Sequence, residues 1–242
     1  MPLPKISTPT YELVLPSTGK TIKYRPFLVK EEKILILALE SQDTKEITNA
    51  IKQVLKDCIL TKGIKVEELP TFDIEYLFLN LRSKSVGESI ELIITCGDDM
   101  ETQVPVTIYI DEIQVQKEEN HSTDIKLDDS LVLRMKYPSL DQFIKNNFDF
   151  NTEQTSSNIE KSLDIIASCI DIIFNEEESW ASSDCTKKEL TAWIETLDSN
   201  QFKQIENFFN TMPKLAHTVK VKNPKTKVES EVTLEGLTSF FG

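Results

Sequence analysis

The chain has 242 residues, 39% of them hydrophobic, so it is long enough for one large domain or two small ones with their own cores. Its 40 acidic and 27 basic side chains give a formal net charge of −13, and an acidic protein is repelled by phosphates, which argues against nucleic acid as a partner. The longest apolar run, Ile34–Leu39, is far shorter than the roughly 20 residues of a membrane helix. No apolar stretch follows Met1–Lys5, so we expect neither a membrane partner nor a signal peptide.

The first half of the chain is expected to form a hairpin, three helices and a second hairpin. Alternating strands at 11–15 and 21–24 flank a turn whose proline and glycine suit turn dihedrals, and Pro26 then opens the first helix. Asp43 or Thr44 is predicted to cap the second helix and Thr71 the third. The spacing of apolar residues places helices at about 27–40, 44–60 and 69–82, and the strands of the second hairpin at 88–95 and 102–110.

The second half is expected to repeat this order. A polar, charged stretch from Gln114 to Thr123 reads as a linker, and Thr186–Glu189 fits a capping box. The predicted elements are a hairpin over 124–137, helices at about 139–147, 158–174, 187–197 and from Ser199 to Pro213, and a closing hairpin at 217–221 and 229–234.

The two halves therefore predict an α+β protein in which antiparallel hairpins flank a small helical bundle twice. We expect an N-terminal unit over 1–115, a linker over 116–123 and a C-terminal unit over 124–242. Both leading hairpins end in Lys-Tyr followed by a proline, at Tyr24 and at Tyr137. The match is explained either by an internal duplication or by chance.

Candidate chemistry is sparse. The carboxylate pairs Asp98-Asp99 and Asp128-Asp129 and the run Glu176–Glu178 lie in expected turns, where water keeps the pKa of a carboxyl near its usual value, whereas a general acid needs a raised pKa. The two histidines, His121 and His217, have no nearby Ser, Cys or Asp pattern, and the sequence has no glycine-rich phosphate loop. We therefore predict no catalytic residues and no cofactor, with a carboxylate-based hydrolase as a remote alternative.

Metal binding is not expected either. The cysteines Cys58, Cys96, Cys169 and Cys185 are far apart, and a chain of this length does not need disulfides, so a protein of the cell interior is expected. Cys58 and Cys169 lie among apolar residues of expected helices, which predicts buried thiols. A zinc ribbon places paired cysteines in the turns of two hairpins. The turn Cys96–Asp99 has one cysteine, and the matching turn of the closing hairpin, Asn223–Thr226, has none.

Aromatic and apolar residues provide the candidate contact sites. Leu237, Phe240 and Phe241 form an apolar C-terminal end that either packs back into the core or docks on a partner. Together with Phe27 they are the predicted partner-binding residues. The hairpins also offer strand edges for pairing with neighbours.

Several segments, in order along the chain, resemble baseplate hub assembly proteins of T-even-like contractile-tailed bacteriophages. They are Leu15–Gly19, Tyr24–Lys33 with Leu35 and Ala38–Ser41, Leu69–Asp73, Leu81–Gly87, Met135–Ser139, Thr211–Lys214, and Leu234–Leu237 with Phe240-Phe241. Some members of that family carry paired cysteines in the hairpin turns, and this chain departs from them there. The resemblance implies no catalytic residues.

The resemblance implies a structural component of the virion's tail baseplate, assembled in the host cytoplasm and working through contacts with other baseplate and tail proteins. Subunits of a tail lie on a symmetric ring, so several copies per assembly are expected. The alternative is an assembly chaperone that is absent from the finished virion, and the sequence suits both.

Overall fold

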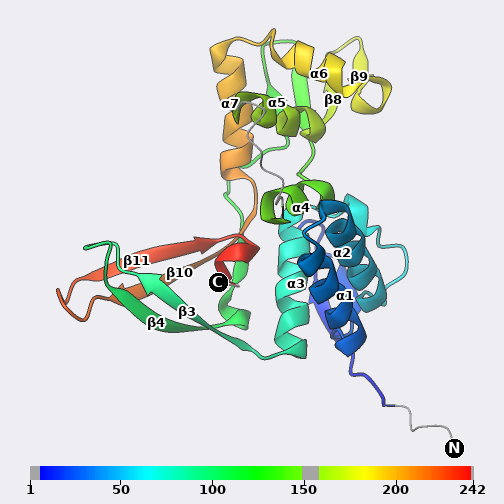
Figure 1. Ribbon diagram of the computed structural model, residues 1–242. Coiled ribbons are helices and arrows are strands. Elements are labelled where there is room, and N and C mark those ends of the chain that lie inside the picture. The colour runs from blue at the N-terminus through cyan, green and yellow to red at the C-terminus, as the bar shows by residue number, and fades with distance from the viewer. Residues whose placement is uncertain (1–5, 149–157, 241–242) are drawn as a thin grey trace, which may run out of the picture. The chain divides into compact units, whose positions relative to one another are not determined.

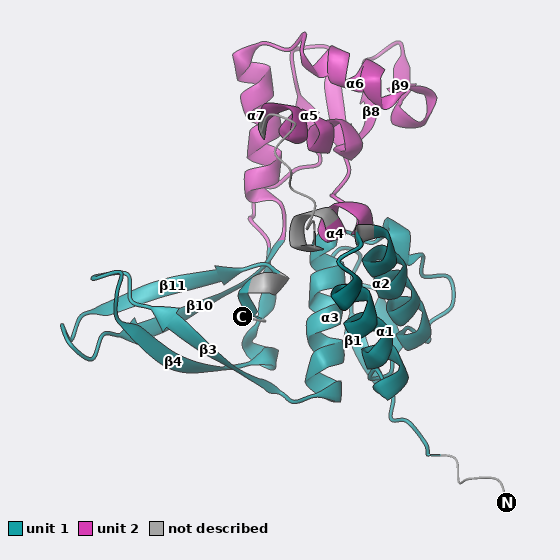
Figure 2. Ribbon diagram, viewed as in Figure 1, with its two compact units in different colours: residues 1–116, 214–242 teal, residues 117–213 magenta. Residues whose placement is uncertain are grey.

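The structure is a computed structural model that describes residues 6–148 and 158–240, and it confirms the predicted α+β class. The chain divides into two compact units (Figures 1 and 2). The first unit contains residues 1–116 and 214–242, and the second contains residues 117–213. Each unit is described in turn.

The first unit begins with the predicted hairpin and three helices. These elements are β1 (Tyr11–Val14), β2 (Thr21–Tyr24), α1 (Val29–Ser41), α2 (Thr44–Cys58) and α3 (Thr71–Ser85). Asp43 caps α2, since its carboxylate accepts hydrogen bonds from the backbone N–H of Lys45 at 2.7 Å and of Glu46 at 3.2 Å. The predicted Thr71 cap is wrong, because Pro70 occupies the N-cap position of α3 and Thr71 is already helical.

Helix α3 lies at the centre of the first unit. The sequence predicts one apolar face on this helix, but its buried residues lie on more than one side, and they include Phe72, Ile74, Leu77, Leu79 and Leu81. None of the residues of α3 is exposed, so neighbouring elements cover this helix on all sides. α3 contacts strands and 3₁₀ turns from the middle and from the C-terminal part of the chain, among them β5, β10 and η4 (Leu237–Phe240).

The closing hairpin belongs to this first unit. The predicted second hairpin forms as β3 (Ser89–Thr95) and β4 (Gln103–Tyr109), and the closing one as β10 (Lys214–Lys222) and β11 (Glu229–Glu235). β10 pairs on its other side with β5 (Gln114–Gln116), in the register Leu215 with Val115. The structure therefore differs from the predicted units 1–115 and 124–242, because pairing between strands about a hundred residues apart leaves no local sequence pattern.

The second unit holds a four-stranded antiparallel sheet and helices. Its elements are β6 (Asp124–Lys126), β7 (Val132–Met135), α4 (Leu140–Phe148), α5 (Asn158–Cys169), β8 (Ile170–Phe174), β9 (Ser179–Ala181), α6 (Lys187–Ile194) and α7 (Ser199–Thr211), with the strands in the order β6-β7-β8-β9. The predicted helix over 158–174 is wrong beyond Cys169, because Ile170–Phe174 pairs with β7. The capping box at Thr186 and Glu189 is confirmed.

The core of the second unit lies among this sheet, α5, α6 and α7. Its most buried members are Leu133 and Ile170 of the sheet and Ile205 of α7, each without exposed area, with Ala167 and Phe208 beside them. Cys169 is buried in the same cluster, and burial raises the pKa of its thiol to about 11. This supports the predicted buried-thiol interpretation.

The first part of each unit repeats one hydrogen-bond pattern. The backbone N–H of Arg25 donates to the Cys58 carbonyl at 3.0 Å, and that of Lys136 donates to the Cys169 carbonyl at 2.7 Å. Leu28 and Ser139, at the same spacing, accept the first backbone bonds of α1 and α4 through their carbonyls. The structural correspondence therefore pairs Tyr24 with Met135, both buried, rather than with Tyr137 as the Lys-Tyr match suggests.

A buried ion pair holds α1 to the first hairpin. The carboxylate of Glu31 has no exposed area, and the Arg25 guanidinium donates to its Oε1 at 2.8 Å, with Lys30 Nζ at 3.0 Å from the same oxygen. The backbone N–H of Leu28 donates to Oε2 at 2.8 Å. Burial by itself would raise the pKa of Glu31, but these donors outweigh it and lower the pKa to about 2.

We predict that Glu31→Gln destabilises the folded protein by about 3 kcal/mol, because it leaves the partly buried guanidinium of Arg25 without its charge partner. Urea denaturation at pH 7 measures this loss, with Glu32→Gln as the exposed control in the same helical turn. Because the folded pKa of Glu31 lies below its usual 4.5, the stabilisation is complete above pH 4.5 and disappears as the pH falls toward 2. Equal losses for the two variants would contradict the prediction.

Candidate functional site

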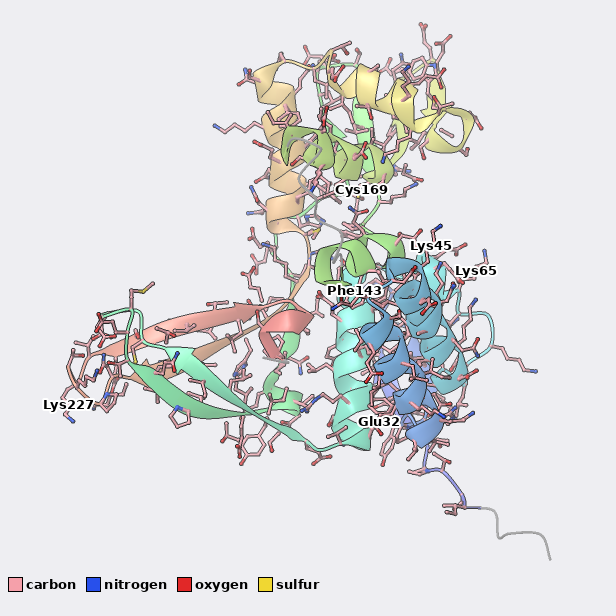
Figure 3. All side chains as sticks on the ribbon, viewed as in Figure 1. Glu32, Lys45, Lys65, Phe143, Cys169 and Lys227 are labelled. Carbon is pink, nitrogen blue, oxygen red and sulfur yellow. The ribbon has the colours of Figure 1, made fainter. Side chains whose placement is uncertain are left out.

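Two hairpin turns of the first unit, Cys96–Met100 and Asn223–Lys227, share one backbone geometry. In the first turn the N–H of Met100 donates to the carbonyl of Cys96 at 3.0 Å, and in the second the N–H of Lys227 donates to the carbonyl of Asn223 at 2.9 Å. Met100 and Lys227 are both left-handed, with φ of 54° and 66°. Figure 3 labels Lys227 at the tip of the β10–β11 hairpin.

The amide of Asn223 joins these turns. Its Nδ2 donates to Asp98 Oδ1 at 3.0 Å and to Asp99 Oδ2 at 2.9 Å, while its Oδ1 accepts from the backbone N–H of Lys225 at 2.8 Å. The hydroxyl of Thr226 also donates to Asp98. Asn223 is completely buried, so its hydrogen bonds replace water for every polar atom of the side chain. We call this group, Asp98, Asp99, Asn223 and Thr226, the turn clasp.

The turn clasp stands where a zinc ribbon would hold its metal. The structure brings the two matching turns together, with Cys96, Asp99, Asn223 and Thr226 at the first and last positions of each four-residue turn. Only Cys96 among these four is a thiol, and its burial raises its pKa, which disfavours the thiolate that binds metal. Within residues 6–148 and 158–240, no group of three or more His, Cys, Asp or Glu side chains could hold a metal ion.

The acidic turns are poor general acids. Hydrogen bonds from Thr226 and Asn223 lower the pKa of Asp98, and those from Thr102 lower the pKa of Asp99. Asp128 is likewise lowered by the backbone N–H groups of Ser130 and Leu131. Glu176–Glu178 are exposed. A carboxyl group whose pKa is lowered remains ionised at neutral pH, whereas proton donation requires the opposite shift.

His121 is engaged within the second unit. Its Nδ1 lies 2.9 Å from Thr211 Oγ1 and its Nε2 lies 3.0 Å from the Tyr137 hydroxyl. The Thr211 hydroxyl donates to the carbonyl of Asn207, so its oxygen accepts from the His121 ring. Burial lowers the pKa of His121, which keeps the ring neutral. The arrangement is that of a hydrogen-bonded structural histidine.

The predicted partner-binding aromatic residues have different environments. Phe240 is completely buried, and η4 lies against α3 and β11, so this side chain packs into the core. Phe27 is half-buried, with its backbone N–H bonded to the Ser85 hydroxyl at 3.1 Å. Leu237 begins η4, and Phe241 lies outside the described residues.

Helix α1 carries an exposed apolar surface. Val29 is 79% exposed, Ile36 49% and Leu37 54%, whereas Glu31 and Ala38 are the buried residues of the helix. We call Val29, Ile36 and Leu37 the α1 stripe. The sequence placed this helix by its apolar spacing, but that spacing does not indicate which of its apolar residues face solvent. The signal for exposure was the run Ile34–Leu39, which is apolar on every side of the helix and exceeds what one buried face requires.

The family model for the T4 bacteriophage base plate protein matches residues 8–242. The chain belongs to this baseplate protein family. Searches of curated proteins and of solved structures return no match. Among the described residues of this baseplate protein, no helix is long and apolar enough to cross a membrane.

Membership in the family indicates the role, location and contacts of the protein. It is a structural component of a phage baseplate, located in the virion's tail baseplate and in contact with other tail or baseplate proteins. An exposed apolar helix face fits such a setting, because large exposed apolar patches mark surfaces that a partner covers.

We predict that Asn223→Ala destabilises this baseplate protein by about 2 kcal/mol, because the change removes the hydrogen bonds of a buried amide to Asp98, to Asp99 and to two backbone N–H groups. Urea denaturation measures the loss, with Lys225→Ala in the same turn as control. An NMR titration should show the pKa of Asp98 and Asp99 rising toward their usual range in Asn223→Ala only. Unchanged stability and unchanged carboxyl titration would contradict a clasp held by Asn223.

Proposed function

We propose that this baseplate protein is a non-enzymatic component of the baseplate hub that acts through protein–protein contacts. The single observation that supports this most is the α1 stripe, where three aliphatic side chains face solvent on a helix whose buried residues include a charged one. A soluble monomer gains nothing from this inverted arrangement, whereas a subunit that is covered after assembly does.

The hub assignment rests on the resemblance of ordered segments along the chain. They cover the Leu15–Gly19 turn, the start of α1 and the C-terminal end. The net charge of −13 keeps the free protein soluble before assembly in the host cytoplasm. Several copies per assembly are expected on a symmetric tail.

The absence of enzymatic activity is supported by the electrostatics of the acidic turns. The lowered pKa of Asp98 and of Asp99 argues against the carboxylate-based hydrolase. These side chains are engaged in joining two hairpin turns, and that use explains their presence without catalysis.

The alternative, an assembly chaperone that leaves the particle, differs in one observable. Quantitative mass spectrometry of purified tails and of infected-cell lysate should find this protein in the tails in a fixed ratio to known baseplate subunits. A known scaffolding protein serves as the control for carry-over. Detection in lysate but not in purified tails would support the chaperone and contradict the structural hub role.

A further inference from the structure

The α1 stripe lies on the side of its helix that faces away from the first unit. At 100° per residue, positions 29, 36 and 37 share a side opposite Glu31 and Ala38, and Lys33 and Glu40 lie on that same side. Lys33 and Glu40 are exposed. Among the described residues neither of them makes an ion pair or a hydrogen bond. The outward side of α1 is therefore an apolar centre flanked by one positive and one negative charge.

The charges on this side are symmetric about the centre of the stripe. Lys33 precedes the midpoint between Ile36 and Leu37 by the same number of residues as Glu40 follows it. When two copies of α1 cross antiparallel at that midpoint, Lys33 of each copy meets Glu40 of the other. Ile36 of each copy then meets Leu37 of the other, in the centre of the contact.

The local charge of α1 permits a like partner at this surface. The protein carries −13 overall, so two copies repel each other at most faces. The exposed charged side chains of α1 are two lysines, Lys30 and Lys33, and two glutamates, Glu32 and Glu40. Their charges cancel, so this helix is a place where two copies approach without that repulsion.

The second copy of the hairpin–helix unit shows the same side of its helix covered. By the hydrogen-bond correspondence, Val29 and Lys33 of α1 match Leu140 and Ile144 of α4. Leu140 and Ile144 are both buried. The repeated unit thus uses this side for packing in one copy and leaves it open in the other.

We propose that Ile36 and Leu37 of the α1 stripe form the centre of a contact with a second copy of this chain, joined in an isologous, antiparallel α1–α1 pair with reciprocal Lys33–Glu40 ion pairs. This inference rests on the proposed function, because it names the partner for the contact surface proposed there. A 13-residue helix is about 20 Å long, and one such helix pair is smaller than a standard interface. The dimer is therefore weak and depends on concentration.

Sedimentation equilibrium of the full chain over a range of concentrations tests the pair. The wild type should show a monomer–dimer equilibrium, and Leu37→Lys should raise the dissociation constant by about tenfold or more. Ile93→Lys, which changes an apolar residue that is also exposed but lies on β3, is the matched control and should leave the equilibrium unchanged. Far-UV circular dichroism verifies that each variant is folded.

A charge swap tests the antiparallel geometry. Lys33→Glu and Glu40→Lys should each weaken the dimer, because each places like charges opposite one another across the pair. The double variant K33E/E40K restores opposite charges and should return the wild-type dissociation constant. Only a contact between identical helices in this orientation gives that rescue.

A monomer at all concentrations would overturn the inference, as would a dimer insensitive to Leu37→Lys. A double variant as weak as the single variants would overturn it too, since the reciprocal ion pairs would then be absent. The hub proposal is judged separately, by the presence of the protein in purified tails. A monomeric protein that is present in tails would refute the α1 pair alone, and the stripe would then belong to another baseplate subunit.

Discussion

The ion pair between Arg25 and Glu31 is the constraint on which the first unit depends. Its carboxylate is completely buried, and a buried charge is tolerated only when partners satisfy it. Arg25 also donates its backbone N–H to Cys58 at the end of α2, so one residue links β2, α1 and α2. α1 is thereby anchored by a polar contact and Ala38. Its larger apolar side chains are left free to face outward.

The second copy of the hairpin–helix unit dispenses with this ion pair. Lys136 and Gln142 stand at the positions of Arg25 and Glu31, and a glutamine supplies no charge for a cation to match. In this copy the helix is held by buried aliphatic and aromatic residues, Leu140, Phe143 and Ile144. The same backbone scaffold is thus stabilised in two ways. The ion pair that anchors α1 leaves the apolar side of that helix exposed, whereas α4 is held by packing the corresponding side.

Local chemistry made much of the fold predictable, and the errors have a common cause. The Asp43 cap, the Thr186–Glu189 capping box and the paired hairpin turns each follow from residues a few positions apart. The strand Ile170–Phe174 continues a helical pattern and is decided by its pairing with β7, and β5 is decided by β10. The exposure of the α1 stripe could not be predicted, because periodicity finds apolar positions without showing which of them a neighbour covers.

The turn clasp connects two hairpin turns through side-chain hydrogen bonds, at a place where a zinc ribbon uses a metal ion. A zinc ion would tie two turns through four ligands, and folding would then depend on metal and on reduced thiols. Asn223 ties them instead with donors and acceptors already in the chain, at the cost of burying one amide completely. The carboxylates of Asp98 and Asp99 accept these hydrogen bonds, which lower their pKa and keep them ionised. The turn clasp therefore uses an acidic pair that the sequence had offered as candidate catalytic groups. The clasp thus explains these carboxylates through folding. The exposed apolar side of α1 has no such explanation in the fold of the first unit, and a partner that covers it is a physical reason for its composition.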